Sequence, residues 1–459
     1  MIGNIAILIF SFIFICLITI YLVRKWPDLD VIDVYLIFVL FHFGFYPFIR
    51  GLYFGKDIIF DFRQADPLAL GLVFGQVLII LMIIRGISLY FPTIIAYNLK
   101  LSYLIQQWSK VNKYLLLSIY LLLMVFPFIS YYKYGIRTYI LPEDYEKIGK
   151  QLPYWFTSIR TTYIYIGFCV FLGLVAKITQ SKNSQKVMWI ILTIIYVPII
   201  TISGRRYFLN MIVMAAILWF GYNKINIFRL KYLSIALLLF SVFLLFSNMY
   251  QSYRDTLFTV GKVDLNKLEN PISAALNFNS TIKNLKIRAG TWEFNFLIFN
   301  NQINKSGMAT HGKITFEAIK SSIPRFFWPE KQFSLIDDIL VRLCKVTYQE
   351  VFTGKNIFGI AQVDYSYYSI IIVPVTILLI FLMMAGLINI SLRYPTFLLL
   401  FTGIIIDYLI NIEENGNMIF IMFRNILLLL LLFGGYLFVY KIYSNLLNLK
   451  RNKKLKAAT

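Results

Sequence analysis

Residues 366–389 read SYYSIIIVPVTILLIFLMMAGLIN and contain no charged side chain. A helix of about 20 apolar residues crosses a bilayer, so this stretch predicts a membrane span. Ten further stretches have the same character, at approximately 2–23, 32–49, 67–84, 114–132, 162–180, 187–203, 207–222, 232–249, 395–412 and 417–440. The expected fold class is an all-α polytopic membrane protein with about 11 transmembrane helices.

The composition of the 459 residues agrees with this prediction. Hydrophobic residues make up 59% of the chain, charged residues 14%, and the mean hydropathy is +0.71. Soluble domains are about 45–50% apolar and about a quarter charged, so a soluble enzyme, a disordered chain and a fibrous chain are excluded. Three cysteines are too few for a disulfide scaffold.

The net charge of +22 comes mainly from basic residues between the apolar segments. We interpret it as orientation bias and attraction to anionic headgroups, with no nucleic acid as a partner. With eleven spans, the basic short loops and the C-terminal tail all fall on one side, which the positive-inside rule assigns to the cytoplasm. The N-terminus is then expected outside.

This topology divides the chain into four parts. Residues 1–249 hold spans one to eight, residues 366–440 hold the last three spans, and residues 441–459 form a basic cytoplasmic tail. Residues 250–365 are too long and too polar for a connector, so we expect them to form one large outer loop. Within this loop, 272–300 and 312–345 show patterns compatible with short amphipathic helices.

Polar residues that are costly in a bilayer gather at the predicted outer side. Asp407 lies in the outer part of one span and Arg424 about two turns into the last, which makes them a natural ion pair, either functional or only structural. The basic and aromatic residues expected to bind substrate at this side are Arg205, Arg206, Arg254, Arg288, Arg325, Trp292 and Trp328.

Arginine binds phosphate through two parallel hydrogen bonds and stays charged, so these arginines suit a lipid-linked diphosphate. The tryptophans suit the attached sugar. The alternative for Arg205 and Arg206 is snorkelling to headgroups, and for the tryptophans it is headgroup anchoring. The sequence shows no His-x-x-His pair, no cysteine pair and no Gly-rich phosphate loop. We therefore expect no metal and no cofactor, and chemistry on a donor that is already activated.

Four short motifs carry a family resemblance. They are Ser203-Gly204-Arg205-Arg206-Tyr207 between two spans, Tyr253-Arg254 after the next span, Ile323-Pro324 followed by Phe327-Trp328-Pro329, and Glu413-Glu414 followed by Arg424. In this order, with one large outer loop in the C-terminal half, the chain resembles the Wzy-type O-antigen polymerases. The resemblance covers most of the chain as architecture.

The resemblance implies a GT-C-like bundle in the bacterial inner membrane and metal-independent glycosyl transfer at its periplasmic face. The growing glycan would leave undecaprenyl diphosphate and join a hydroxyl at the non-reducing end of the next undecaprenyl-diphosphate-linked repeat unit. Arg205 or Arg206, Arg254 and Arg424 would hold the diphosphate. The related ligases rely on a loop histidine, which makes His311 the first choice of base, with Glu413, Glu414 and Asp364 as the other candidates. A chain-length regulator in the inner membrane would be a partner.

Other functions share part of this pattern. An O-antigen ligase would use the same donor but transfer the glycan to lipid A core. A flippase or other transporter of lipid-linked oligosaccharides would show inverted repeats and charges around the midplane, whereas these charges gather outside. A structural partner in an envelope complex would not need Arg424. A membrane O-acyltransferase would need a histidine within a span, and only His42 is available.

Overall fold

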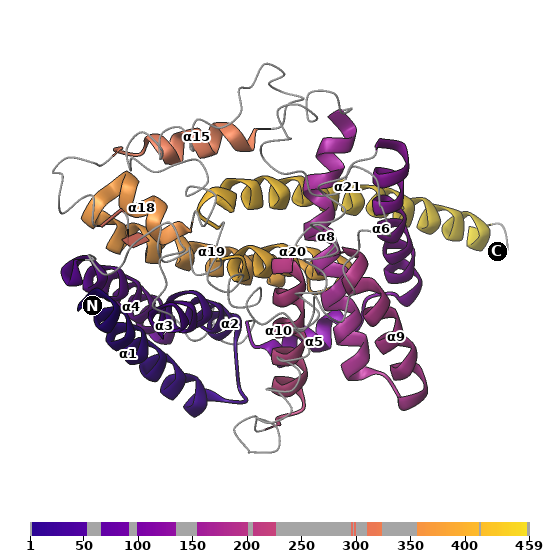
Figure 1. Ribbon diagram of the computed structural model, residues 1–459. Coiled ribbons are helices and arrows are strands. Elements are labelled where there is room, and N and C mark those ends of the chain that lie inside the picture. Colours follow the sequence, from indigo (N-terminus) through magenta and orange to yellow (C-terminus); the bar gives the residue numbers. More distant parts are fainter. Residues whose placement is uncertain are drawn as a thin grey trace.

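The computed structural model describes residues 2–52, 66–90, 99–134, 154–200, 205–225, 295–296, 298–299, 310–323, 356–412 and 415–456. Helices account for nearly all of them (Figure 1). Six helical segments are long and apolar enough to cross a membrane: Ile5–Lys25, Val31–Ile49, Pro67–Ser88, Tyr163–Gln180, Ile357–Ser391 and Ile419–Ile442. The chain is therefore an all-α membrane protein.

The predicted spans can be compared with these helices one by one. Each predicted span that lies within the described residues falls on a helix. The segment 232–249 lies outside them, so the total of eleven spans stays a prediction. The extent of the outer loop also stays a prediction, because the structure describes only parts of 250–365.

The N-terminal helices form one packed group. They are α1 (Ile2–Lys25), α2 (Val31–Leu40), the π-helical turn η1 (Phe41–Phe45), α3 (Tyr46–Leu52) and α4 (Pro67–Tyr90). Helix α1 packs against α3 and α4, with the rings of Phe10 and Phe74 stacked at 6.1 Å between centroids. In η1 the N–H of Tyr46 donates to the carbonyl of Phe41, five residues back, so the helix widens within a predicted span.

The middle of the chain adds α5 (Leu101–Trp108), α6 (Lys113–Tyr134), α8 (Tyr154–Gln180), α9 (Asn183–Ile200) and α10 (Arg205–Tyr222). The short helix α5 buries Leu101, Leu104, Ile105 and Trp108, the spacing of one helical face. It packs against α8, α10 and α20 (Pro395–Ile410), and the indole N–H of Trp108 donates to the Thr402 hydroxyl at 2.9 Å.

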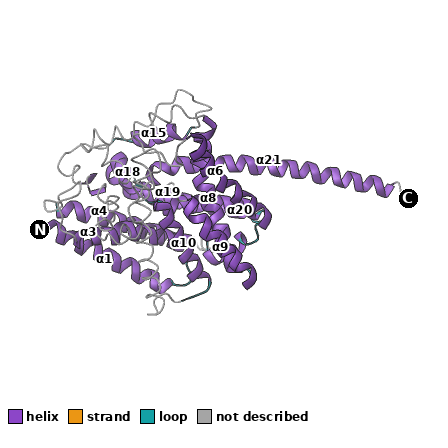
Figure 2. Ribbon diagram, turned by 45° about the vertical axis from the view of Figure 1, so that its right-hand side comes forward, coloured by secondary structure: helices purple, strands orange, loops and turns teal. Residues whose placement is uncertain are grey.

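The C-terminal elements carry the candidate site. They are α15 (Lys313–Ser322), α18 (Ile357–Tyr365), the 3-10 turn η6 (Ser366–Tyr368), α19 (Ser369–Ser391), α20 and α21 (Asn415–Lys456). Helix α20 packs closely on α8, because Gly403 has no Cβ and lets the Cys169 thiol approach its backbone. The 42-residue α21 runs past the other helices and ends as a projecting rod (Figure 2).

Two findings refine the picture of the predicted outer loop. Helix α15 buries Ile314 and Ala318 and exposes Phe316 and Ile319, so a short amphipathic helix does form within 312–345. The stretch 357–365, at the end of the predicted loop, is α18, whose residues from Ile357 to Asp364 are all buried. Helix α18 therefore belongs to the packed body and leads directly into η6 and α19.

Candidate functional site

The turn before α15 presents His311 in an unusual backbone conformation. His311 has φ +51° and is exposed, and Gly312 follows with φ +84°. Two consecutive left-handed residues are disfavoured, although histidine is among the side chains found there more often and glycine enters at no steric penalty. Such a turn persists only when its surroundings hold it.

The side chain of Asp364, in α18, fixes much of the turn at His311 and Gly312. Its buried carboxylate accepts the backbone N–H of Ile314 at 3.0 Å, the N–H of Thr315 at 2.6 Å and the Thr315 hydroxyl at 2.5 Å. The Thr310 hydroxyl also donates to it. Gly312, at the N-cap of α15, has no side chain to satisfy the first N–H groups of the helix. The Asp364 carboxylate takes over this role, and its charge suits the helix N-terminus.

Backbone contacts tie the same turn to the end of α18. The N–H of Thr310 donates to the carbonyl of Val363 at 2.9 Å, and the N–H of Gly312 to the carbonyl of Asp364 at 3.3 Å. These bonds lie on either side of His311. The histidine is therefore held between two fixed points and its side chain faces outward.

A buried polar group anchors α18 to the body. The Gln76 amide of α4 donates to the Gln362 side-chain oxygen at 2.9 Å and to the Ser369 hydroxyl at 2.7 Å. Ser369 in turn donates to the Gln362 oxygen at 2.6 Å. Gln362 lies two residues before Asp364, so the position of the carboxylate is set by helices α4 and α19.

Arg424 of α21 lies at the other end of α15. Its Nη1 donates to the carbonyl of Ser322, the last residue of the helix, at 3.3 Å, and its Nε and Nη2 face the Asn425 side-chain oxygen. A cation at a helix C-terminus is favourable. Helix α15 is thus held by a carboxylate at one end and a guanidinium at the other, about 14 Å apart along its axis.

The remaining predicted site residues fall into three groups. Asp407 is buried in α20, and its pairing with Arg424 stays a prediction. Arg205 and Arg206 open α10 as its first two residues, with side chains outside the described part. The others lie outside the described residues: Arg254, Arg288, Trp292, Arg325, Trp328, Glu413 and Glu414. Of the predicted site residues, Asp364 holds the turn that carries His311 at the start of α15, and Arg424 contacts the opposite end of the same helix.

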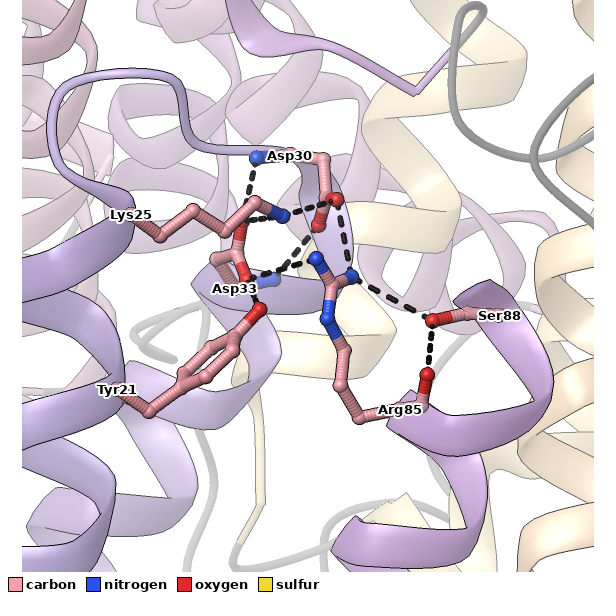
Figure 3. Close-up of polar contacts among 6 residues, drawn as sticks. All are labelled: Tyr21, Lys25, Asp30, Asp33, Arg85 and Ser88. Atoms are coloured by element: carbon pink, nitrogen blue, oxygen red, sulfur yellow. Dashed lines mark hydrogen bonds and ion pairs between the residues drawn. The ribbon is translucent and has the colours of Figure 1, made fainter. Parts of the chain in front are cut away.

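Sequence reasoning missed a charged cluster where α1, α2 and α4 meet (Figure 3). Lys25 lies 2.6 Å from both Asp30 and Asp33, and Arg85 lies 3.1 Å from Asp30 and 4.0 Å from Asp33. The hydroxyl of Tyr21 donates to Asp33 at 2.9 Å. The available signals were the closely spaced Asp28, Asp30 and Asp33, the last of them inside the predicted span 32–49, and Arg85 at the end of the span 67–84.

The cluster is balanced, with two carboxylates and two cations. Asp30 caps α2 and exchanges hydrogen bonds with Asp33 in a capping box. Burial raises the pKa of Asp30, but the nearby Lys25 and Arg85 outweigh it and hold the pKa below its usual value of 3.8. The carboxylates and cations pair with one another, so we infer that the cluster has a structural role and joins helices α1, α2 and α4.

Within the described ranges no group of three or more His, Cys, Asp or Glu side chains is placed to hold a metal ion. No protein-family model, no curated protein and no solved structure matches the chain. The case for function rests on the residues themselves.

Proposed function

We propose that the chain is a polysaccharide polymerase of the bacterial cytoplasmic membrane. It would transfer a growing glycan from undecaprenyl diphosphate to a hydroxyl of the next lipid-linked repeat unit. The observation that supports this most is α15, which has the His311 turn fixed by Asp364 at one end and Arg424 at the other. These three residues were chosen from their chemistry, their place in the sequence and the family resemblance.

In this proposal His311 is the general base. Its neutral imidazole accepts the proton of the acceptor hydroxyl, and the hydroxyl oxygen attacks the anomeric carbon of the donor sugar. The bond from that carbon to the diphosphate oxygen breaks, and the electron pair leaves with the diphosphate. Glu413 and Glu414 are the alternative bases. Asp364 is already occupied by four donors from Thr310, Ile314 and Thr315, so we assign it to positioning.

Arg424 would bind the leaving diphosphate and stabilise its developing charge. Phosphate oxygens are stronger partners for a guanidinium than neutral acceptors such as the Ser322 carbonyl and the Asn425 side-chain oxygen, which Arg424 contacts. In an in-line displacement, the base and the groups that hold the leaving group lie on opposite sides of the reacting carbon. The further arginines proposed for the diphosphate are Arg205, Arg206 and Arg254.

The proposal requires the His311 end of α15 to face the periplasm. A cysteine placed at Ser306, in a background without the three native cysteines, tests this orientation. A membrane-impermeant thiol reagent should label it in intact cells whose outer membrane is permeable. Labelling only after the cytoplasmic side is opened would overturn the topology.

A gene deletion in the host, complemented with variants, tests the function. Loss of the long polysaccharide ladder, with one repeat unit left on the lipid core, indicates a polymerase. Loss of all repeats from the core, with polymer still on undecaprenyl diphosphate, indicates a ligase. An unchanged ladder excludes both. His311→Ala and Arg424→Ala should behave like the deletion, and Arg424→Lys should fail as well, because lysine lacks the bidentate fork.

A further inference from the structure

We propose that Asp364 is a positioning residue that fixes the left-handed turn presenting His311 to the acceptor hydroxyl. This inference rests on the proposed function, in which His311 is the base. It adds that the base on the loop is aligned by a buried carboxylate of the membrane body.

The hydrogen bonds define the turn from both sides. Thr310 donates to Asp364 through its hydroxyl and to Val363 through its backbone, just before His311. Ile314 and Thr315 donate to the same carboxylate just after it. A single side chain therefore sets the conformation of the residues on both sides of His311.

The carboxylate that holds this turn lies in the packed body of the protein. Asp364 is fully buried, and Gln362, two residues earlier, is bonded to Gln76 of α4 and Ser369 of α19. His311 itself is exposed and has a positive φ. An exposed base on a strained turn keeps one orientation only if the surrounding structure holds the turn in place. The hydrogen bonds to the buried Asp364 carboxylate do this.

Amide hydrogen exchange of the full-length protein in nanodiscs tests whether Asp364 fixes the turn. In Asp364→Ala the amides of Ile314 and Thr315 should exchange at least about ten-fold faster than in the native chain. Glu317→Gln is the matched control, since it removes another carboxylate of α15, one that pairs with Lys320 at 2.8 Å, and preserves the side-chain shape. Native-like exchange in Asp364→Ala would overturn the inference and leave the proposed function standing.

A double-mutant comparison of polymerisation rates tests whether Asp364 affects the reaction through His311. If Asp364 acts through His311, then Asp364→Ala should slow polymerisation, and combining it with His311→Ala should be no worse than His311→Ala alone. Asp364→Asn, which keeps one acceptor oxygen, should fall between the native chain and Asp364→Ala. Losses that multiply in the double variant would overturn the inference. Native activity of His311→Ala would overturn both the base assignment and the role given to Asp364.

Milder variants cover the case in which Asp364→Ala does not accumulate. Thr310→Val and Thr315→Val each remove one hydroxyl donor to the carboxylate and preserve side-chain shape. Each should speed exchange at Ile314 and Thr315 by roughly five-fold, the equivalent of one hydrogen bond. Unchanged amide exchange in both variants would contradict the proposal that Asp364 fixes this turn.

Discussion

Asp364 accepts the backbone N–H of Thr315 at 2.6 Å, so a carboxylate of α18 caps a helix that begins some 50 residues earlier in the chain. This contact links two parts of the predicted loop that the sequence alone gives no reason to pair. It joins the segment carrying the only histidine of that loop to a helix buried in the membrane body.

The first prediction concerns Gly312. Replacing it with alanine places a Cβ in a left-handed conformation, which costs about 1–2 kcal/mol. The new Cβ would lie 3.7 Å from the Tyr365 ring, so conformation and not collision is the cause. We expect faster amide exchange across 310–315 and slower polymerisation. Gly75→Ala, in open space within α4, is the control and should match or exceed native stability. Equal behaviour of the two variants would argue against a strained turn.

The second prediction concerns the charged cluster. Asp33→Ala would leave Lys25 and Arg85 short of one carboxylate and deprive the Tyr21 hydroxyl of its acceptor. Removing one partner from a buried ion pair typically costs about 3–5 kcal/mol, so thermal unfolding in detergent should shift clearly downward. The pair of Glu317 with Lys320, three residues apart on one helix, should contribute less, about 0.2–0.5 kcal/mol. An Asp33→Ala variant as stable as Glu317→Gln would show that the cluster does not join these helices.

The third prediction concerns pH. Because the pKa of Asp30 is lowered in the folded protein, its ionised form stabilises the fold at pH values above the usual 3.8. This contribution is lost as the pH falls through the lowered pKa. Unfolding temperatures measured between pH 7 and pH 3 should therefore drop less steeply at the acid end in Asp30→Asn. The exposed Asp28→Asn should retain the native profile. Identical acid profiles for Asp30→Asn and the native chain would contradict this assignment.

How far the sequence predicts the structure depends on the kind of interaction. Apolar runs such as 366–389 predict helices well, because the bilayer requires every backbone polar group to be paired within the segment. The π-helical turn at Phe41–Phe45 and the burial of α18 escaped prediction. Gln362 and Asp364 read as loop residues in the sequence, and only tertiary contacts to Gln76 and Thr315 explain why they are buried.

The sequence proposes residues for the candidate site but not how they are arranged. His311, Asp364 and Arg424 were chosen from residue type, position and the family resemblance, whereas their arrangement around α15 depends on long-range contacts. The Lys25, Asp30, Asp33 and Arg85 cluster was missed for the same reason. Charges at the ends of spans resemble loop charges until the partner helix is known.

The fourth prediction concerns the contact between α8 and α20. A Cβ on Gly403 would lie 2.5 Å from the Cys169 sulfur, so Gly403→Ala should destabilise the protein by about 1–3 kcal/mol through overpacking. Adding Cys169→Ala removes the obstructing sulfur and should restore part of the loss. Gly386→Ala, with open space around it, should be tolerated. Failure of Cys169→Ala to improve Gly403→Ala would contradict the proposed packing.

Polymerisation in a purified system shows whether this protein elongates glycans and whether His311 and Arg424 are needed for it. The protein is reconstituted in liposomes with undecaprenyl-diphosphate-linked repeat units and a metal chelator, and the glycans are separated on a gel. We expect a ladder of lengthening chains with the native protein and only single units with His311→Ala or Arg424→Ala. No elongation by the native protein, or equal ladders from the native chain and both variants, would show that the proposed function or the proposed roles of these residues are wrong.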